Sequence, residues 1–316
     1  MDIKKLIKIL LTGVGVLSFA FVSGLIVFFK TDLFENERAL WVETAMSTSN
    51  HQYLATWFLS QEEIDSILSE HEVINDTNSN SESVQISEPV ENKITEYDIS
   101  GDTYTGTVVT ISDPTSVSLM NTLEDGSGQK LSEVVSNENL AVAMNAGGFS
   151  FSRRLSSSGG LNSLTIIDGT VLYGESGVTY SMIGMSKDGK LMLGNYTIEQ
   201  ALEAGIDDAI EFGPFLVVNG ENQIDSEVSG GIQPRTAIGQ TEDGTFIFVV
   251  IEGRTTQSLG ATYYDLQEIM NDFGAVNAAN LDGGGSSSLY YYGTLMNTLS
   301  NNSERSIPTA FVVTGA

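Results

Sequence analysis

A glycine-rich run near the C-terminus contains the residues whose types and spacing best suit chemistry. The run reads Asn280-Leu281-Asp282-Gly283-Gly284-Gly285-Ser286-Ser287-Ser288. Glycine lets a backbone turn tightly and approach a ligand, and successive N–H groups in such a loop can bind an anion. Asp282 adds a carboxylate, and Asn280 and the serines add neutral hydrogen-bonding groups. No Gly-Lys-Ser/Thr follows, so this is no Walker nucleotide loop, and a plain tight turn explains the spacing about as well.

Other strand-like stretches also end beside glycine and a polar residue. Arg235 begins one of them, and the chain has only 14 Lys and Arg, so this Arg is a candidate phosphate clamp. A surface ion pair is the equally ordinary alternative. A second stretch ends in Glu252-Gly253-Arg254, and a third ends at Asn145. Because loops at strand ends often carry function, the pattern indicates that they converge on one site.

Composition excludes several classes of chemistry. His51 and His71 are the only histidines and cysteine is absent. A Ser-His-Asp triad, a His-ligated metal or a thiolate nucleophile is therefore excluded after residue 71. The net charge of −27 repels phosphates, so no nucleic-acid partner is expected. An anionic substrate would need local cations or backbone N–H groups.

The ordered motifs resemble one family. NAGGF, GPFLVVNG, PRTAIG, EGR and NLDGGGSSSLYYYG occur in this order, and together they resemble the phosphodiester glycosidase family over roughly residues 95–316. The resemblance implies an enzyme that hydrolyses a sugar-1-phosphodiester at the glycosidic C–O bond of a phosphorylated glycan or glycoconjugate. Two positions depart from the family pattern: Ser150 stands where a Phe is usual, and Glu252 stands where an Asp is usual.

The resemblance also suggests roles for the candidate residues. Asp282 and Glu252 are the expected catalytic carboxylates, which would activate water or attack the anomeric carbon. The leaving phosphate would be neutralised by Arg235 and the N–H groups of Gly283, Gly284 and Gly285. Sugar and phosphate contacts are further expected from four polar residues: Asn145, Asn280, Arg254 and Ser286.

Two alternatives remain open at this point. The same cleft could belong to a non-catalytic glycan-binding accessory protein in exopolysaccharide or cell-wall polymer assembly. The sequence requires no cofactor, but Asp and Asn oxygens near glycine carbonyls are also suitable ligands for Ca²⁺.

The elements that position these residues follow from turns and periodicity. Three hairpins are expected, over 164–173, 182–193 and 237–251, each turning at an Asp-Gly pair. Helices are expected over 197–204 and 262–273, each ending at a glycine. Many hairpins with few helices predict an α+β fold, mixed but mainly antiparallel, preceded by one transmembrane helix.

The N-terminal third has a different character. Residues 9–29 are almost continuously apolar, which is long enough to span a bilayer, and lysines at 4, 5 and 8 place residues 1–8 in the cytoplasm. A cleaved signal peptide is the rival interpretation. Residues 30–74 are expected to form a helical juxtamembrane stalk, with a capping box of Ser60 and Glu63. Residues 75–92 predict a flexible linker, and 93–316 an extracellular phosphodiester glycosidase-like domain.

Overall fold

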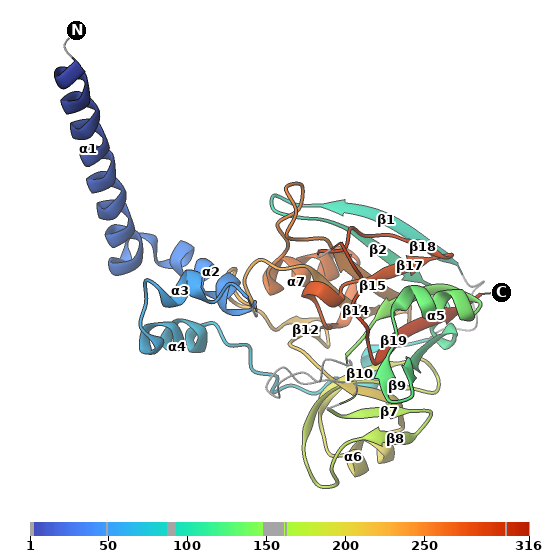
Figure 1. Cartoon of the computed structure of the whole chain (residues 1–316). Helices are drawn as coiled ribbons and strands as arrows, with labels where there is room; N and C mark the ends of the chain where they lie inside the picture. Colours follow the sequence, from blue (N-terminus) through green and yellow to red (C-terminus); the bar gives the residue numbers. More distant parts are fainter. Residues whose placement is uncertain are drawn as a thin grey trace. The chain divides into compact units, whose positions relative to one another are not determined.

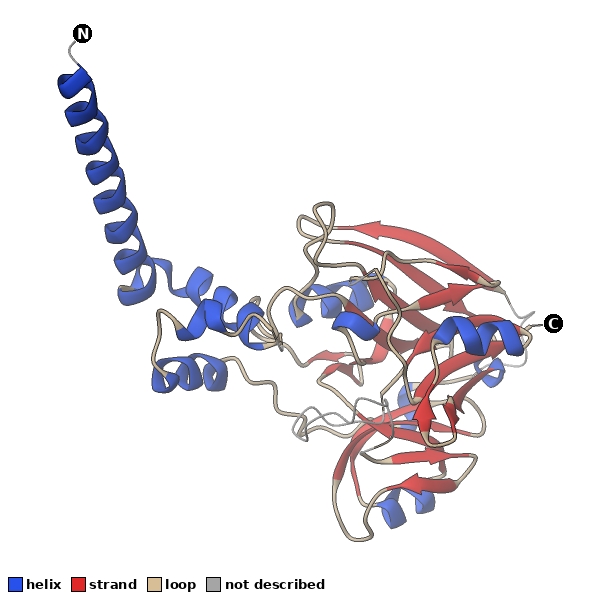
Figure 2. Cartoon of the chain, in the orientation of Figure 1, coloured by secondary structure: helices blue, strands red, loops and turns tan. Residues whose placement is uncertain are grey.

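The computed structural model describes residues 3–48, 50–86, 93–147, 161, 163–300 and 302–315. They divide into two compact units, Met1–Glu72 and Val73–Ala316. Helices form the first unit, whereas strands dominate the second (Figures 1 and 2). The helices of four or more residues are α1 (Ile3–Lys30), α2 (Glu35–Met46), α3 (Tyr53–Thr56), α4 (Gln61–Glu70), α5 (Leu131–Asn137), α6 (Ile198–Glu203) and α7 (Tyr263–Asp272).

The first unit is a small aromatic cluster at the end of a long apolar helix. Phe29 at the end of α1 stacks on Phe58, with ring centroids 4.5 Å apart. Ser60 and Glu63 form the predicted capping box at the start of α4, so this prediction is confirmed. Among the described residues, α1 alone is long and apolar enough to cross a membrane, a test that a signal sequence also passes.

The second unit contains three larger antiparallel sheets. The first has the order β1-β2-β15-β14-β16-β12-β13, the second β10-β9-β11-β7-β8 and the third β18-β17-β6-β19-β3. The strands of the first sheet are β1 (Ile94–Ser100), β2 (Thr105–Ile111), β12 (Phe215–Val218), β13 (Glu221–Asn222), β14 (Arg235–Thr241), β15 (Phe246–Ile251) and β16 (Ala275–Asn280). Those of the second are β7 (Thr165–Ile167), β8 (Thr170–Tyr173), β9 (Tyr180–Ser186), β10 (Leu191–Tyr196) and β11 (Ile206–Glu211). Those of the third are β3 (Val117–Asn121), β6 (Leu140–Asn145), β17 (Leu289–Tyr291), β18 (Thr294–Leu295) and β19 (Thr309–Thr314), and a short β4–β5 pair (Leu123–Glu124 and Ser127–Gly128) stands apart.

Strand β15 shows why the seven-stranded sheet is central. Its side chains alternate between two faces, as the period of a strand requires. Phe246 and Phe248 enter a core shared with the other two large sheets, where Phe248 lies 6.2 Å from Phe311 of β19. Ile247 and Val249 face the opposite core, which α7 covers. Because both faces are buried, the strand is apolar at every position.

The structure confirms the predicted hairpins and helices. The three hairpins are β7–β8, β9–β10 and β14–β15, with Asp168 and glycines 169, 189 and 244 at positive φ in the turns. The two predicted helices are α6 and α7, and both begin with capping boxes. The α+β class with mainly antiparallel sheet is therefore confirmed.

Residues 75–86 differ from the predicted flexible linker. They run along the second unit, where Ser79 and Leu193 exchange two hydrogen bonds of 2.6 and 2.8 Å and Val84 is buried. We call residues 73–86 the strap. Its polar side chains, which suggested disorder, instead bond to backbone groups that are distant in sequence. Residues 87–92 of the predicted linker lie outside the described residues.

Candidate active site

The Asp282 loop joins two sheets, because it follows β16 of the first sheet and leads into β17 of the third. Its start is tied to the end of β6. The Asp282 N–H donates to the Ala146 carbonyl at 3.0 Å, and the Asn145 side-chain amide donates to the Asp282 carbonyl at 2.6 Å. Thus the structure brings together Asn145 and Asp282, which are 137 residues apart in sequence.

Asn145 holds this loop with both ends of its amide. Besides the bond to Asp282, its Oδ1 accepts from the Thr236 hydroxyl and from the Ser288 N–H, each at 3.0 Å. The side chain is fully buried. Its geometry therefore supports a loop-anchoring role, and the predicted contact with sugar hydroxyls stays a prediction.

Close packing explains one of the three glycines, and backbone conformation explains a second. A Cβ on Gly283 would lie 2.6 Å from the Pro234 carbonyl oxygen, and Gly284 has a φ of +62°. The Gly284 N–H donates to that same carbonyl at 2.8 Å, so it is not available to an anion. The expected anion-binding nest therefore rests on the N–H groups of Gly283 and Gly285.

Arg235 is bound to backbone carbonyls of neighbouring segments. Its Nε donates to Ala261 at 3.0 Å, and its Nη2 donates to the carbonyls of Gly230 and Gly231 at 2.6 and 2.7 Å. The guanidinium lies 4.1 Å from the centre of the Tyr263 ring. This buried arginine holds the turn before β14, and its predicted phosphate contact stays a prediction.

Two other arginines lie over the loop. The Arg254 guanidinium is 3.5 Å from where a Cβ on Gly284 would stand, and it donates to Gln233 at 2.6 Å. Arg305 donates to the Ser286 hydroxyl at 3.4 Å. Burial, and then the positive charges of Arg235 and Arg305, lower the pKa of Arg254. Neither Arg254 nor Arg305 forms an ion pair with a described carboxylate.

The sequence interpretation did not identify Arg305. It follows Glu304 in a polar stretch before β19, where a charged residue is expected to face solvent. Only the pairing of β19 with β6 brings it beside the Asp282 loop. Its one sequence signal is the rarity of Lys and Arg in the chain.

Asp282, the one acid of the loop, has a strongly raised pKa. Its side chain is 2% exposed, and burial raises its pKa to about 7, against the opposing effects of a Ser286 hydrogen bond and the Arg305 charge. Its Oδ2 is buried without a hydrogen-bond partner, as are Asn280 Oδ1 and Ser287 Oγ. Unpartnered buried polar atoms are costly, so three on one loop mark a place that a polar ligand would satisfy.

The burial of Asp282 also limits access. Residues 148–160, which follow Gly147 in the sequence, lie outside the described residues. The departure at Ser150 and the rest of the NAGGF motif therefore lie there as well.

Glu252 links three segments of the domain through its carboxylate. Its Oε1 accepts from the Thr298 N–H at 2.7 Å, and its Oε2 accepts from the Thr105 hydroxyl at 3.2 Å. These bonds tie the end of β15 to β2 and to the segment after β18. Both oxygens are engaged, so the structure supports a positioning role, and its catalytic role stays a prediction.

Ca²⁺ at the Asp282 loop also stays a prediction. The described residues bring three carboxylates together elsewhere, at Asp168, Asp207 and Asp208. Asp208 accepts from the N–H groups of Asp168 and Leu119, each at 3.0 Å, and Asp207 pairs with Lys187. The carboxylates of Asp207 and Asp208 are therefore already partnered within the protein.

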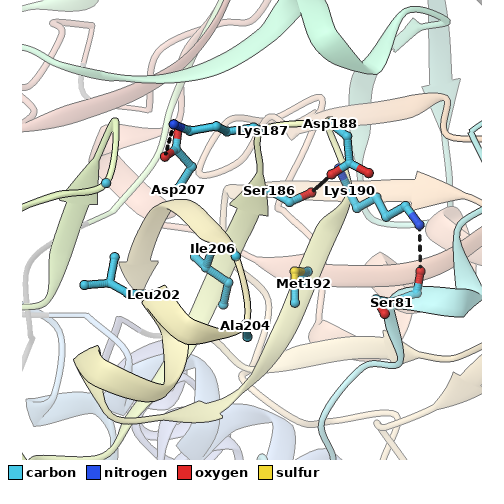
Figure 3. A pocket seen from close by; sticks show the side chains of 12 residues that line it. Ser81, Ser186, Lys187, Asp188, Lys190, Met192, Leu202, Ala204, Ile206 and Asp207 are labelled. Atoms are coloured by element: carbon cyan, nitrogen blue, oxygen red, sulfur yellow. Dashed lines mark hydrogen bonds and ion pairs between the residues drawn. The ribbon is translucent and has the colours of Figure 1, made fainter.

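A cavity of about 660 Å³ has no residue of the Asp282 loop in its lining. Figure 3 shows the residues that line it. It is lined by the β9–β10 turn, the α6–β11 turn and Ser81 of the strap. Figure 3 shows Lys187 directed at Asp207, and Lys190 directed at the Ser81 carbonyl, which it reaches at 3.0 Å. None of the predicted site residues lines this cavity, and its cations are already engaged.

Comparison with known proteins gives a consistent picture. A family model described as phosphodiester glycosidase matches residues 138–314, which is more than half of the chain. Human N-acetylglucosamine-1-phosphodiester alpha-N-acetylglucosaminidase is 28% identical over 187 residues, covering 54% of this chain and 30% of that protein. The mouse protein of the same name is 26% identical over 149 residues, covering 41% and 28%.

Two further proteins were compared: one matches a short part of the sequence, and the other is a solved structure with a similar fold. The SPbeta prophage-derived uncharacterized protein YomE of Bacillus subtilis is 42% identical over 74 residues, covering 23% of this chain and 12% of that protein. The chain thus spans less than a third of the curated relatives it matches. The zebrafish catalytic domain of the same glucosaminidase, solved auto-inhibited by its pro-peptide, aligns with a TM-score of 0.59 and 24% identity. It covers 78% of this chain and 91% of that domain, which shows a shared fold.

Proposed function

The chain belongs to the phosphodiester glycosidase family, and on that premise we propose that it hydrolyses a sugar-1-phosphodiester at the Asp282 loop. One observation carries the proposal. Two arginines that pair with no described carboxylate, Arg254 and Arg305, lie against the same glycine loop as an acid whose pKa is raised to about 7. Such a loop suits a substrate that has an anion on one side of the scissile bond and a sugar on the other.

The proposed reaction uses water as the nucleophile. Water attacks the anomeric carbon, the glycosidic C–O bond breaks, and the phosphate monoester leaves with the bonding electrons. The anomeric carbon keeps the new hydroxyl, and Asp282 takes the proton that the water loses. A carboxyl with a pKa near the working pH is well suited to this proton transfer. Arg254 and Arg305 would stabilise the charge that develops on the leaving phosphate.

The test measures which bond breaks. Full-length protein in detergent is incubated in ¹⁸O-water with a panel of sugar-1-phosphodiesters, beginning with N-acetylglucosamine, which the mammalian relatives carry in their names. We expect ¹⁸O in the free sugar and none in the phosphate monoester. Label in the phosphate would contradict glycosidic cleavage. Arg38→Ala, which removes a half-buried arginine of the first unit, is the matched control for Arg305→Ala.

The non-catalytic alternative has its own observation. Asp282 is 2% exposed and both Glu252 oxygens are engaged, an arrangement that would also serve a glycan-binding cleft. Phosphoglycan binding that is unchanged in Asp282→Asn, with no product across the panel, would favour the binding protein.

The location we propose is the outer face of a membrane, where the substrate would be a cell-surface polysaccharide or glycoconjugate. Helix α1 has the length and composition of a span, and Lys4, Lys5 and Lys8 precede its apolar stretch. We expect the full-length chain in the membrane fraction after an alkaline wash, and protease added outside intact cells to digest the second unit. A mature N-terminus beyond residue 20 would identify a cleaved signal sequence instead.

A further inference from the structure

The strap contacts the protein beside the Asp282 loop. Asn75, near the start of the strap, accepts the Phe215 N–H through its Oδ1 at 2.9 Å. Its own carbonyl accepts from the Asn195 side chain at 2.5 Å, so the strap is fixed at this point. A Cβ on Gly213 would lie 2.8 Å from Asn75 Nδ2, which shows how closely the side chain packs on the segment 213–215.

Asn280 holds the same segment from another side. Its backbone N–H donates to the Pro214 carbonyl at 2.9 Å, and its side-chain Nδ2 donates to the Gly213 carbonyl at 2.8 Å. The segment 213–215 therefore lies between Asn75 of the strap and Asn280 of β16. A displacement of this segment changes where the Gly213 carbonyl lies, and with it the orientation of the Asn280 amide.

The remaining end of that amide is the Asn280 Oδ1, which is buried without a partner two residues before Asp282. Because Nδ2 is held by Gly213, Oδ1 is fixed as an open acceptor. We infer that Asn75 is a positioning residue for the Asp282 loop: it fixes the segment 213–215, which orients Asn280 to accept a hydroxyl of the substrate sugar. This inference rests on the proposed function.

A purely structural strap is the competing explanation, and the chain offers a matched control. Near the other end of the strap, Ser83 Oγ accepts from the Asn277 side chain of β16 at 3.1 Å. Ser83→Ala removes a strap-to-β16 hydrogen bond, as Asn75→Ala removes a strap-to-β12 bond, but it does not touch residues 213–215. Asn75→Asp keeps an acceptor for the Phe215 N–H and is the conservative rescue.

The experiment compares these variants in the full-length protein by two measurements. Hydrogen exchange of peptides covering 213–216 and 278–281 reports the positioning directly and needs no turnover. Steady-state kinetics on the sugar-1-phosphodiester that the wild type cleaves reports the consequence. In Asn75→Ala we expect faster exchange in both peptides and a loss of about tenfold in kcat, below the roughly hundredfold that a 1 Å misplacement can cost.

The controls separate the outcomes. Ser83→Ala should lower the melting temperature about as much as Asn75→Ala while keeping the wild-type kcat, and Asn75→Asp should restore both exchange and kcat. Equal kcat in Asn75→Ala and Ser83→Ala would overturn the inference, and a higher kcat in Asn75→Ala would show a brake instead. If the wild type has no turnover, the proposed function fails and exchange decides: unchanged protection of 278–281 in Asn75→Ala overturns the positioning.

Discussion

The Asp282 loop and the cavity between β9, β10 and α6 are two polar regions of one domain that differ in how fully their polar groups are partnered. In the cavity, each lysine has a partner: Lys187 pairs with Asp207, and Lys190 reaches the Ser81 carbonyl. Around the loop, Arg254 and Arg305 have no described carboxylate partner within 4 Å, and Asp282 Oδ2 is unpartnered. The lysines of the cavity are therefore engaged within the protein, whereas the loop keeps a buried carboxylate oxygen that a ligand would satisfy.

The substitution Asp282→Asn should have the largest effect and tests this difference between the two regions most directly. If Asp282 takes the proton from water, kcat/KM should fall about 10³-fold, within the range for removal of a general base. In the wild type, kcat/KM should rise as the pH rises through about 7, because the ionised carboxylate of Asp282 is the active form. Asp188→Asn at the cavity is the matched control. Activity that survives in Asp282→Asn would move the chemistry elsewhere.

The same substitution should stabilise the protein at high pH. Burial raises the folded-state pKa of Asp282 from 3.8 to about 7, so the folded state keeps a proton that the unfolded state releases. The free energy of unfolding should therefore fall between about pH 4 and pH 7, by as much as about 4 kcal/mol for this shift. Urea unfolding at pH 5 and pH 8 should show more than half of this loss in the wild type and a smaller loss in Asp282→Asn. Equal losses would mean that Asp282 ionises normally.

Removal of either loop arginine should have a smaller effect. A hydrogen bond to a charged group contributes about 1.5–3 kcal/mol, so Arg305→Ala and Arg254→Ala should each lower kcat/KM by about 10- to 100-fold. The loss should be smaller for a sugar substrate with an uncharged leaving group, because no phosphate remains to be neutralised. An equal loss for charged and neutral leaving groups would argue for a structural role.

The cavity lysines should matter least. Lys187 is largely exposed and its ion pair is 3.4 Å long, and exposed pairs contribute about 0–1 kcal/mol. Lys187→Ala and Lys190→Ala should therefore change kcat/KM by less than about twofold. A large loss of activity or of phosphoglycan binding in either variant would make the cavity part of the site and end the contrast.

The sequence predicted those features that depend on neighbours along the chain. The Asp-Gly turns, the helix caps and the alternation of β15 are local, and they produced the correct hairpins and helices. The Asp282 loop was also recognisable, because glycines beside a carboxylate are a local pattern. The sequence could not show which partner each side chain binds. The carbonyls that accept hydrogen bonds from Arg235, for example, come near it only when the chain folds.

Two findings had almost no local signal. Arg305 lies in a polar stretch whose approach to the loop depends on the order of β19 and β6 in the sheet. The strap lacks an apolar period, which predicts a linker, yet its partners Leu193 and Phe215 lie more than 100 residues away. A polar segment that binds backbone groups and a polar segment that stays solvated have the same composition.

The strap has a consequence for any shortened form of the protein. Strand β10 is the outermost strand of its sheet, and Ser79 engages both the N–H and the carbonyl of Leu193 on its open side. A fragment that begins at residue 93 would expose these groups, and an uncovered edge strand pairs readily with another copy. Such a fragment should self-associate as its concentration rises, whereas one that begins at residue 73 should remain monomeric.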